Sequence, residues 1–109
     1  MITDITNEAQ LQDVIHSTNA ILFKHSTSCS LSDLAYREVR SFSESHPEIP
    51  VFVISVIERR AFSDRLAELF QVKHASPQIL IIRDEHAVLN FSHQRITKST
   101  IENSIGVPA

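Results

Sequence analysis

The apolar residues of this chain follow two different spacings, which predict strands alternating with helices. Four short runs have the length and the apolar or β-branched content of buried or half-buried strands. These runs cover residues 20–25, 51–56, 78–82 and 87–91. Between them, apolar residues recur every three or four positions, as on one face of an amphipathic helix. Such helices are predicted over residues 7–17, 30–45 and 62–70, with a last one after Thr97.

Residues with known preferences for helix ends and turns set the expected boundaries. Thr6 is predicted to cap the first helix and Thr97 the last, because a threonine oxygen there accepts a hydrogen bond from a free backbone N–H group. Gly106 followed by Pro108 predicts the end of the last helix. The polar connection over residues 83–86 predicts a hairpin, although it contains no glycine.

The resulting order of elements, αβαβαββα, is that of a thioredoxin-like α/β fold. Two parallel strands joined by a helix are followed by another helix, a hairpin and a final helix. We therefore expect a central mixed sheet of four strands flanked by helices. The chain is expected to form one domain over residues 1–109, since folding at this length buries roughly two-thirds of the surface and needs no disulfide or metal.

Composition and charge argue against several classes of partner. With 42% hydrophobic and 21% charged residues, the chain resembles an ordinary globular protein. Its net charge of -3 provides no basic field for the phosphates of a nucleic acid. No apolar stretch approaches the roughly 20 residues of a membrane span, and the N-terminus lacks the features of a secretory signal. A single cysteine without such a signal predicts a cytoplasmic protein, because a free thiol persists in a reducing compartment.

Cys29, the only cysteine, falls between the end of a predicted strand and the start of a helix. An inert core cysteine usually sits within an apolar stripe, whereas Thr27, Ser28, Ser30 and Ser32 surround this one with hydroxyl groups. Free N–H groups at a helix N-terminus favour an anion, and the anionic thiolate is the reactive form of cysteine. The pattern therefore predicts a redox site at Cys29.

Ser32 lies three residues after Cys29, where dithiol oxidoreductases carry their second cysteine. It cannot form a disulfide, but its hydroxyl lies one helical turn along and could donate a hydrogen bond to the sulfur. The alternative is an ordinary serine in the first turn of a helix. The sequence leaves both interpretations of Ser32 open.

Pro77 precedes the third predicted strand, and thioredoxin-like folds place a cis-proline at this point, opposite the cysteine. The backbone of the preceding Ser76 would then pair with the substrate. His25, His74 and His93 are candidates for steering or protonating a leaving thiol, although structural or solvated roles are favoured for each. Their spacing does not resemble a metal site, so no metal is expected.

Several short segments together resemble the monothiol bacilliredoxins, a branch of the thioredoxin-like superfamily. The resemblance extends from Leu22 to Thr97. It is carried by Lys24-His25-Ser26-Thr27, Cys29 with Ser32, Val56-Ile57-Glu58, Val72-Lys73-His74 and Ser76-Pro77-Gln78.

This resemblance implies a cytosolic protein of bacteria that use bacillithiol, acting on bacillithiol mixed disulfides of other proteins. Cys29 would take the bacillithiol onto itself, and a second bacillithiol would release it, with Ser32 also in the catalytic turn. Bacillithiol would thus be a co-substrate, and no tightly bound cofactor is expected. The candidate substrate-binding residues are Thr27, Ser28, Ser30, Ser76 and Pro77.

The chain departs from the family pattern at two places. Ser30 follows the cysteine where the family usually has proline, so this departure lies in the active turn. The hairpin carries Asp84-Glu85-His86 where the family has a glycine, and this departure affects only a loop. In addition, Phe23 occupies the position of the buried acid of dithiol thioredoxins, a proton-transfer group that a one-thiol exchange needs less.

Two other functions are compatible with the sequence. Cys29 could ligate an iron–sulfur cluster between two subunits with a small thiol, as in monothiol glutaredoxins. Alternatively, the chain could be a redox-inert interaction domain that retains the thioredoxin-like fold. A visible absorption after anaerobic purification would favour the first alternative, and an unreactive Cys29 the second.

Overall fold

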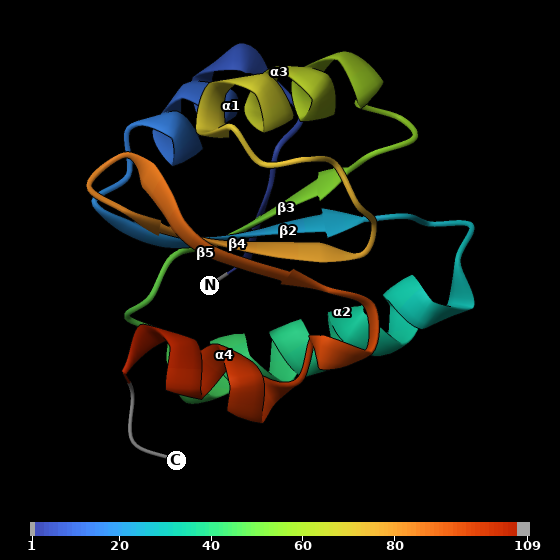
Figure 1. Ribbon diagram of the computed structural model, residues 1–109, viewed down its shortest axis with the longest axis vertical. Helices are drawn as coiled ribbons and strands as arrows, with labels where there is room; N and C mark the ends of the chain where they lie inside the picture. Colours follow the sequence, from blue (N-terminus) through green and yellow to red (C-terminus); the bar gives the residue numbers. More distant parts are fainter. Residues whose placement is uncertain (1, 107–109) are drawn as a thin grey trace.

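The computed structural model describes residues 2–106 and shows one sheet between two layers of helices (Figure 1). The strands are β1 (Ile2–Asp4), β2 (Asn19–His25), β3 (Val51–Ser55), β4 (Gln78–Arg83) and β5 (His86–Ser92). The helices are α1 (Glu8–Ile15), α2 (Ser30–Ser45), α3 (Arg60–Phe70), the short 3-10 helix η1 (His93–Arg95) and α4 (Lys98–Ile105). None of the helices in residues 2–106 is both long and apolar enough to cross a membrane.

The sheet is mixed and has five strands in the order β1-β3-β2-β4-β5. Strands β1, β2 and β3 are parallel, whereas β4 runs antiparallel to β2 and β5 antiparallel to β4. The end of β2 therefore lies beside the start of β4, where Lys24 pairs with Gln78. In Figure 1 the chain leaving β2 and the chain entering β4 lie at the same edge of the sheet. The predicted thioredoxin-like α/β fold is confirmed.

The strand missed by the prediction is β1, so the expected four-stranded sheet is wrong by one edge strand. This strand has three residues and pairs only with β3, from Ile2 opposite Val51 to Asp4 opposite Val53. Three residues are too few to show the alternating pattern by which a strand is detected in a sequence.

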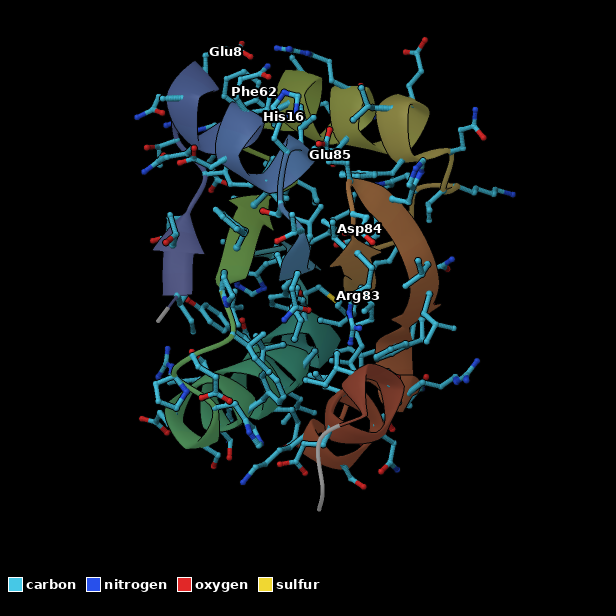
Figure 2. The ribbon with its side chains drawn as sticks, turned by 90° about the vertical axis from the view of Figure 1, so that its left-hand side faces the viewer. Glu8, His16, Phe62, Arg83, Asp84 and Glu85 are labelled. Atoms are coloured by element: carbon cyan, nitrogen blue, oxygen red, sulfur yellow. The ribbon has the colours of Figure 1, made fainter. Side chains whose placement is uncertain are left out.

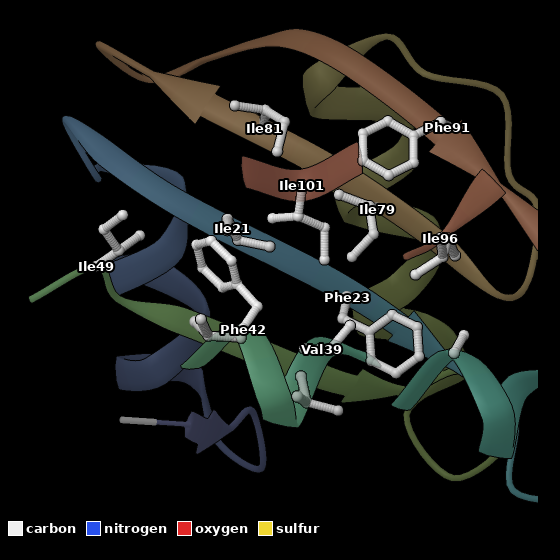
Figure 3. Packing of buried hydrophobic residues seen from close by; sticks show 13 residues of the cluster. Ile21, Phe23, Val39, Phe42, Ile49, Ile79, Ile81, Phe91, Ile96 and Ile101 are labelled. Atoms are coloured by element: carbon white, nitrogen blue, oxygen red, sulfur yellow. The ribbon is translucent and has the colours of Figure 1, made fainter. Parts of the chain in front are cut away.

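Alternation along β2 builds a core on each face of the sheet, because successive side chains of a strand point to opposite sides. Ile21 and Phe23 join the cluster that packs against α2 and α4, and Figure 3 shows this cluster. Ala20 and Leu22 join the cluster that packs under α1 and α3. All four side chains are at most 1% exposed, so β2 is held on both faces and at both edges.

The first helix begins one residue later than predicted, and its cap is Asn7 instead of Thr6. The Asn7 side chain accepts a hydrogen bond from the backbone N–H of Gln10 at 2.9 Å. In return, the Gln10 side chain accepts one from the backbone N–H of Thr6 at 2.7 Å. This reciprocal arrangement is a capping box shifted by one position, and it engages the Thr6 backbone from outside the helix.

The last helix has the predicted ends as far as the structure describes them. Thr97 accepts a hydrogen bond from the backbone N–H of Thr100 at 3.0 Å. Gly106 adopts the left-handed conformation, with φ of 76°, that ends many helices. Pro108 lies outside the described residues.

The hairpin between β4 and β5 turns through two residues without glycine. Asp84 and Glu85 both have positive φ, 50° and 67°, as a tight primed turn requires. Their backbone N–H groups donate to the carbonyls of Thr18 and Ser17, and the Glu85 side chain lies 3.0 Å from His16 (Figure 2). These contacts with the end of α1 offset the strain of two left-handed residues.

Lys24 is a fully buried cation in the central strand, with 0% of its side chain exposed. Its Nζ lies 3.4 Å from Nδ1 of His74, its one hydrogen-bond contact among the described residues. Burial lowers the pKa of Lys24, and the opposing effect of Asp64 is smaller. A buried amine with one long hydrogen bond is poorly compensated for its lost hydration.

We predict that Lys24→Met raises the free energy of unfolding by about 1–2 kcal/mol, because the replacement keeps the length and removes the buried amine. The measurement is urea denaturation of both proteins at pH 7. Lys24→Ala is the matched control and should lower stability, since it also removes the buried methylene stem. A methionine variant less stable than wild type would show that the amine stabilises the fold.

Candidate active site

Cys29 is the N-cap residue of α2, in an extended conformation with φ of -120°. Its backbone N–H donates to the carbonyl of Ser26 at 3.2 Å, which closes a tight turn after β2. Its carbonyl accepts the first helical hydrogen bond from the N–H of Asp33, also at 3.2 Å. The thiol is free and half-buried. The predicted position between strand and helix is therefore confirmed, and a thiolate there lies at the positive end of the helix dipole.

The hydroxyl residues around Cys29 differ in their surroundings. Thr27, Ser28 and Ser30 are exposed. The Thr27 hydroxyl donates to Oε1 of Glu58 at 3.3 Å, and Ser55 at the end of β3 donates to the other oxygen of the same carboxylate. Glu58 thus joins the Cys29 turn to the neighbouring parallel strand.

Ser32 is fully buried and binds the turn. Its Oγ accepts a hydrogen bond from the backbone N–H of Ser26 at 2.9 Å and lies 2.7 Å from Nδ1 of His25. Among residues 2–106 no hydrogen bond joins Ser32 to Cys29. Of the two interpretations that the sequence left open, this geometry favours the structural one.

His25 is also buried, with 7% exposure, and stacks on Phe23 with ring centroids 5.5 Å apart. Burial lowers the pKa of His25, and the nearby carboxylates, with Asp33 foremost, oppose this more weakly. Because Ser32 already accepts from Ser26, we assign its hydroxyl proton to Nδ1 and the ring proton to Nε2, which lies 3.9 Å from Asp33. His25 thus has the structural role that the sequence favoured.

The Ser76–Pro77 peptide bond is cis, as predicted. The pairing of β2 with β4 places it at the edge of the sheet where β2 ends and the Cys29 turn begins. The Pro77 carbonyl accepts a hydrogen bond from the N–H of His93 at 3.1 Å. The buried Ser76 hydroxyl has no hydrogen-bond partner within the described part of the chain.

The loop before Pro77 is held by two hydrogen bonds of the Gln78 side chain. The Gln78 side chain donates to the carbonyl of Lys73 at 3.0 Å and accepts from the N–H of Ala75 at 3.3 Å. His74 contacts the buried Lys24 and is otherwise exposed. His93 is exposed, with φ of 57° and its Nδ1 3.0 Å from the Ser92 hydroxyl. His74 and His93 therefore belong to the loops that frame Pro77.

Two clefts of about 390 Å³ each lie near the Cys29 turn, one lined in part by Leu31 and the other by Thr27. The first is largely apolar and is lined by Leu31, Leu34, Ala35, Arg37, Glu38, His93, Gln94 and Ile96. The second has a more mixed lining of polar and apolar residues: Asp4, Ile5, Thr6, His25, Thr27, Tyr36, Val53, Ser55, Glu58 and Arg59. Most of these residues were missed by sequence reasoning, since they come from separate elements that only the folded sheet brings together.

A sequence profile of the family described as monothiol bacilliredoxin BrxC matches residues 3–101. The chain belongs to the monothiol bacilliredoxin family. The match includes the Cys29 turn, Pro77 and both clefts. The predicted resemblance is thereby confirmed.

Solved structures show the same fold. A protein of thioredoxin fold, described as a candidate oxidoreductase, is 26% identical with a TM-score of 0.87, over 95% of this chain and 93% of that one. Chloroplastic thioredoxin z is 23% identical with a TM-score of 0.74, over 96% of this chain and 91% of that one. Mitochondrial thioredoxin 3 of Saccharomyces cerevisiae is 17% identical with a TM-score of 0.73, over 96% of this chain and 93% of that one. Together with its family, the first likeness makes this bacilliredoxin a thiol oxidoreductase.

The lowered pKa of His25 predicts that this bacilliredoxin loses stability in mild acid. Because the pKa of His25 is lowered in the folded chain, the unfolded chain binds a proton at this histidine more readily below the ordinary pKa of 6.5. The free energy of unfolding should therefore fall with pH below about 6.5, by at most about 1.4 kcal/mol per pH unit for one proton. The measurement is urea denaturation between pH 7.5 and 5.

The control is His25→Phe, which removes the titrating group and keeps a ring in the same pocket. Its stability should depend less steeply on pH over the same range. If the variant retained the full wild-type slope, His25 would not be the group responsible.

Proposed function

We propose that this protein removes bacillithiol from protein mixed disulfides in the cytoplasm of bacteria that use this thiol. The observation that carries the proposal is a single half-buried thiol at the N-cap of α2, at the sheet edge of cis-Pro77, in a chain of this family. A chain with one cysteine cannot form an internal disulfide, so the second thiol of its exchange must come from another molecule.

The first step is attack by the Cys29 thiolate on the bacillithiol sulfur of a mixed disulfide. The S–S bond of the substrate breaks, and the protein thiolate leaves with its electron pair. Free N–H groups in the first turn of α2 stabilise the attacking anion. The product is Cys29 joined to bacillithiol.

The second step regenerates the free thiol. A second bacillithiol thiolate attacks the bacillithiol sulfur bound to Cys29, the bond to Cys29 breaks, and bacillithiol disulfide leaves. Bacillithiol is therefore a co-substrate in this proposal. In each step one thiolate replaces another in a disulfide, so no other oxidant or reductant is needed.

The candidate substrate contacts follow the same edge of the sheet. We assign the backbone of Ser76 to pair with the substrate next to Pro77, and the exposed hydroxyls of Thr27, Ser28 and Ser30 to contact polar groups of bacillithiol. Ser32 positions the turn through Ser26 and His25.

We predict that wild-type protein treated with bacillithiol disulfide gains one bacillithiol per chain, removable by a reductant. Ser32→Cys should instead lose two hydrogens, because the new thiol one helical turn along attacks the adduct and expels the bacillithiol. Intact-mass spectrometry distinguishes the two products.

Cys29→Ser is the control and should remain unmodified. The proposal fails if folded wild-type Cys29 does not react. It also fails if bacillithiolated test proteins keep their adduct in the presence of the wild-type protein and free bacillithiol. Retention of a stable adduct by Ser32→Cys would show that positions 29 and 32 cannot approach each other.

A further inference from the structure

Lys24 and Gln78 lie directly opposite each other in the pairing of β2 with β4. Residues paired in this way send their side chains to the same face of a sheet. Both side chains reach the loop over residues 73–75, which descends from α3 and leads into the cis bond at Pro77 (Figure 1). The loop is therefore held by one cross-strand pair at the end of β2 that precedes the Cys29 turn.

The two side chains bind different parts of this loop. Gln78 binds the backbone, because its side chain donates to the carbonyl of Lys73 and accepts from the N–H of Ala75. Lys24 binds the side chain of the residue between them, with its Nζ 3.4 Å from Nδ1 of His74. Three consecutive loop residues are thus fixed to a single point of the sheet.

The charge of Lys24 determines how His74 takes part in this contact. A lysine ammonium group can only donate, so Nδ1 of His74 accepts and the ring proton lies on Nε2. Burial lowers the pKa of His74, and the cations Lys24 and Arg60 lower it further. Asp64, on the same helix as Arg60, opposes them more weakly. The imidazole is therefore neutral at pH 7, and its Nδ1 is available as the acceptor.

Lys24 is a poor choice for a residue that only fills the core. Its side chain is 0% exposed, and burial is the main cause that lowers its pKa. Within residues 2–106 the contact with His74 is the only hydrogen bond of its amine. A methionine of the same length would fill the space without a buried charge, but it could not hold the loop. The buried amine thus indicates a role in the loop and not in the stability of the core.

We propose that Lys24 is a positioning residue for exchange with protein disulfides, because through His74 it holds the loop that presents the backbone of Ser76 to the substrate. This inference rests on the proposed function, which assigns that backbone pairing. A small disulfide has no main-chain groups for Ser76 to bind. The contact should therefore favour a peptide disulfide over a small one.

The test compares two disulfides of 2-mercaptoethanol: its mixed disulfide with a short peptide that contains one cysteine, and bis(2-hydroxyethyl) disulfide. Total adduct formation at Cys29 is followed by intact mass, and each rate is divided by that of N-acetylcysteine with the same reagent. This correction removes the intrinsic difference between the two reagents. The ratio of the corrected rates is the peptide preference, which should exceed one in the wild-type protein.

Variants at both ends of the contact should lower the peptide preference. Lys24→Met and His74→Leu should each lower it about fivefold, the effect of one ordinary hydrogen bond. The double variant should lose no more than either single variant, because both changes break the same contact. His74→Asn should keep most of the preference, since its amide oxygen can accept from Lys24 in place of Nδ1.

Lys73→Met is the matched control, because it makes the same substitution at an exposed side chain of the same loop. It leaves the carbonyl that Gln78 binds and should keep the wild-type preference. Titration by NMR provides a second measurement. The pKa of His74 should rise in Lys24→Met, because one of the cations that lower it is removed, and should change less in Lys73→Met.

The outcomes distinguish the two proposals. No reaction of wild type with either disulfide would overturn the proposed function and, with it, this inference. An unchanged preference in Lys24→Met or His74→Leu, or an equal loss in Lys73→Met, would overturn the inference and leave the proposed function standing. So would a wild-type preference of one, or independent losses that multiply in the double variant. Because His74 is exposed, His74→Leu decides the question even where Lys24→Met is unstable.

Discussion

The burial of β2 on both faces and at both edges is the constraint on which the rest of the structure depends. Parallel pairing with β3 and antiparallel pairing with β4 satisfy the backbone of the strand, while two apolar clusters cover its faces. Because β2 is held in this way, the position of its C-terminal end is fixed. Cys29 follows that point by four residues, and Pro77 precedes the strand that pairs there. Formation of the core therefore also brings the two parts of the site together.

A buried hydroxyl at position 32 gives the site a different design from that of a dithiol enzyme. The Ser32 oxygen is bonded to Ser26 and His25, so the turn is fixed by hydrogen bonds that do not involve the Cys29 sulfur. A second thiol would have to move and react, whereas this serine can keep both contacts in every redox state of Cys29. Because Cys29 is the only cysteine of the chain, any disulfide that it forms requires a sulfur from another molecule.

Long periodic segments were predictable from sequence, and contacts between distant residues were not. The span of α2 and the cap at Thr97 follow from local patterns, and the location of Cys29 follows from them in turn. The edge strand β1 is too short to show a pattern, and the first helix cap moved to Asn7 because Gln10 can reach both the cap and Thr6. The cleft lined by Asp4, Thr27 and Glu58 depends on β1 lying beside β3, so the place of Asp4 in it carried no signal in the sequence.

The two clefts near the Cys29 turn differ in the chemical groups that they can accommodate. Leu34, 56% exposed in the apolar cleft, suits the side chains of a polypeptide, because burying it on binding removes apolar surface from water. Glu58 and Asp4 in the other cleft disfavour an apolar group, which would desolvate their carboxylates without compensation. Under the proposed function, the two halves of a mixed disulfide therefore bind in one orientation, with the protein half in the apolar cleft. That orientation presents the small-thiol sulfur to Cys29 and leaves the protein sulfur as the leaving group.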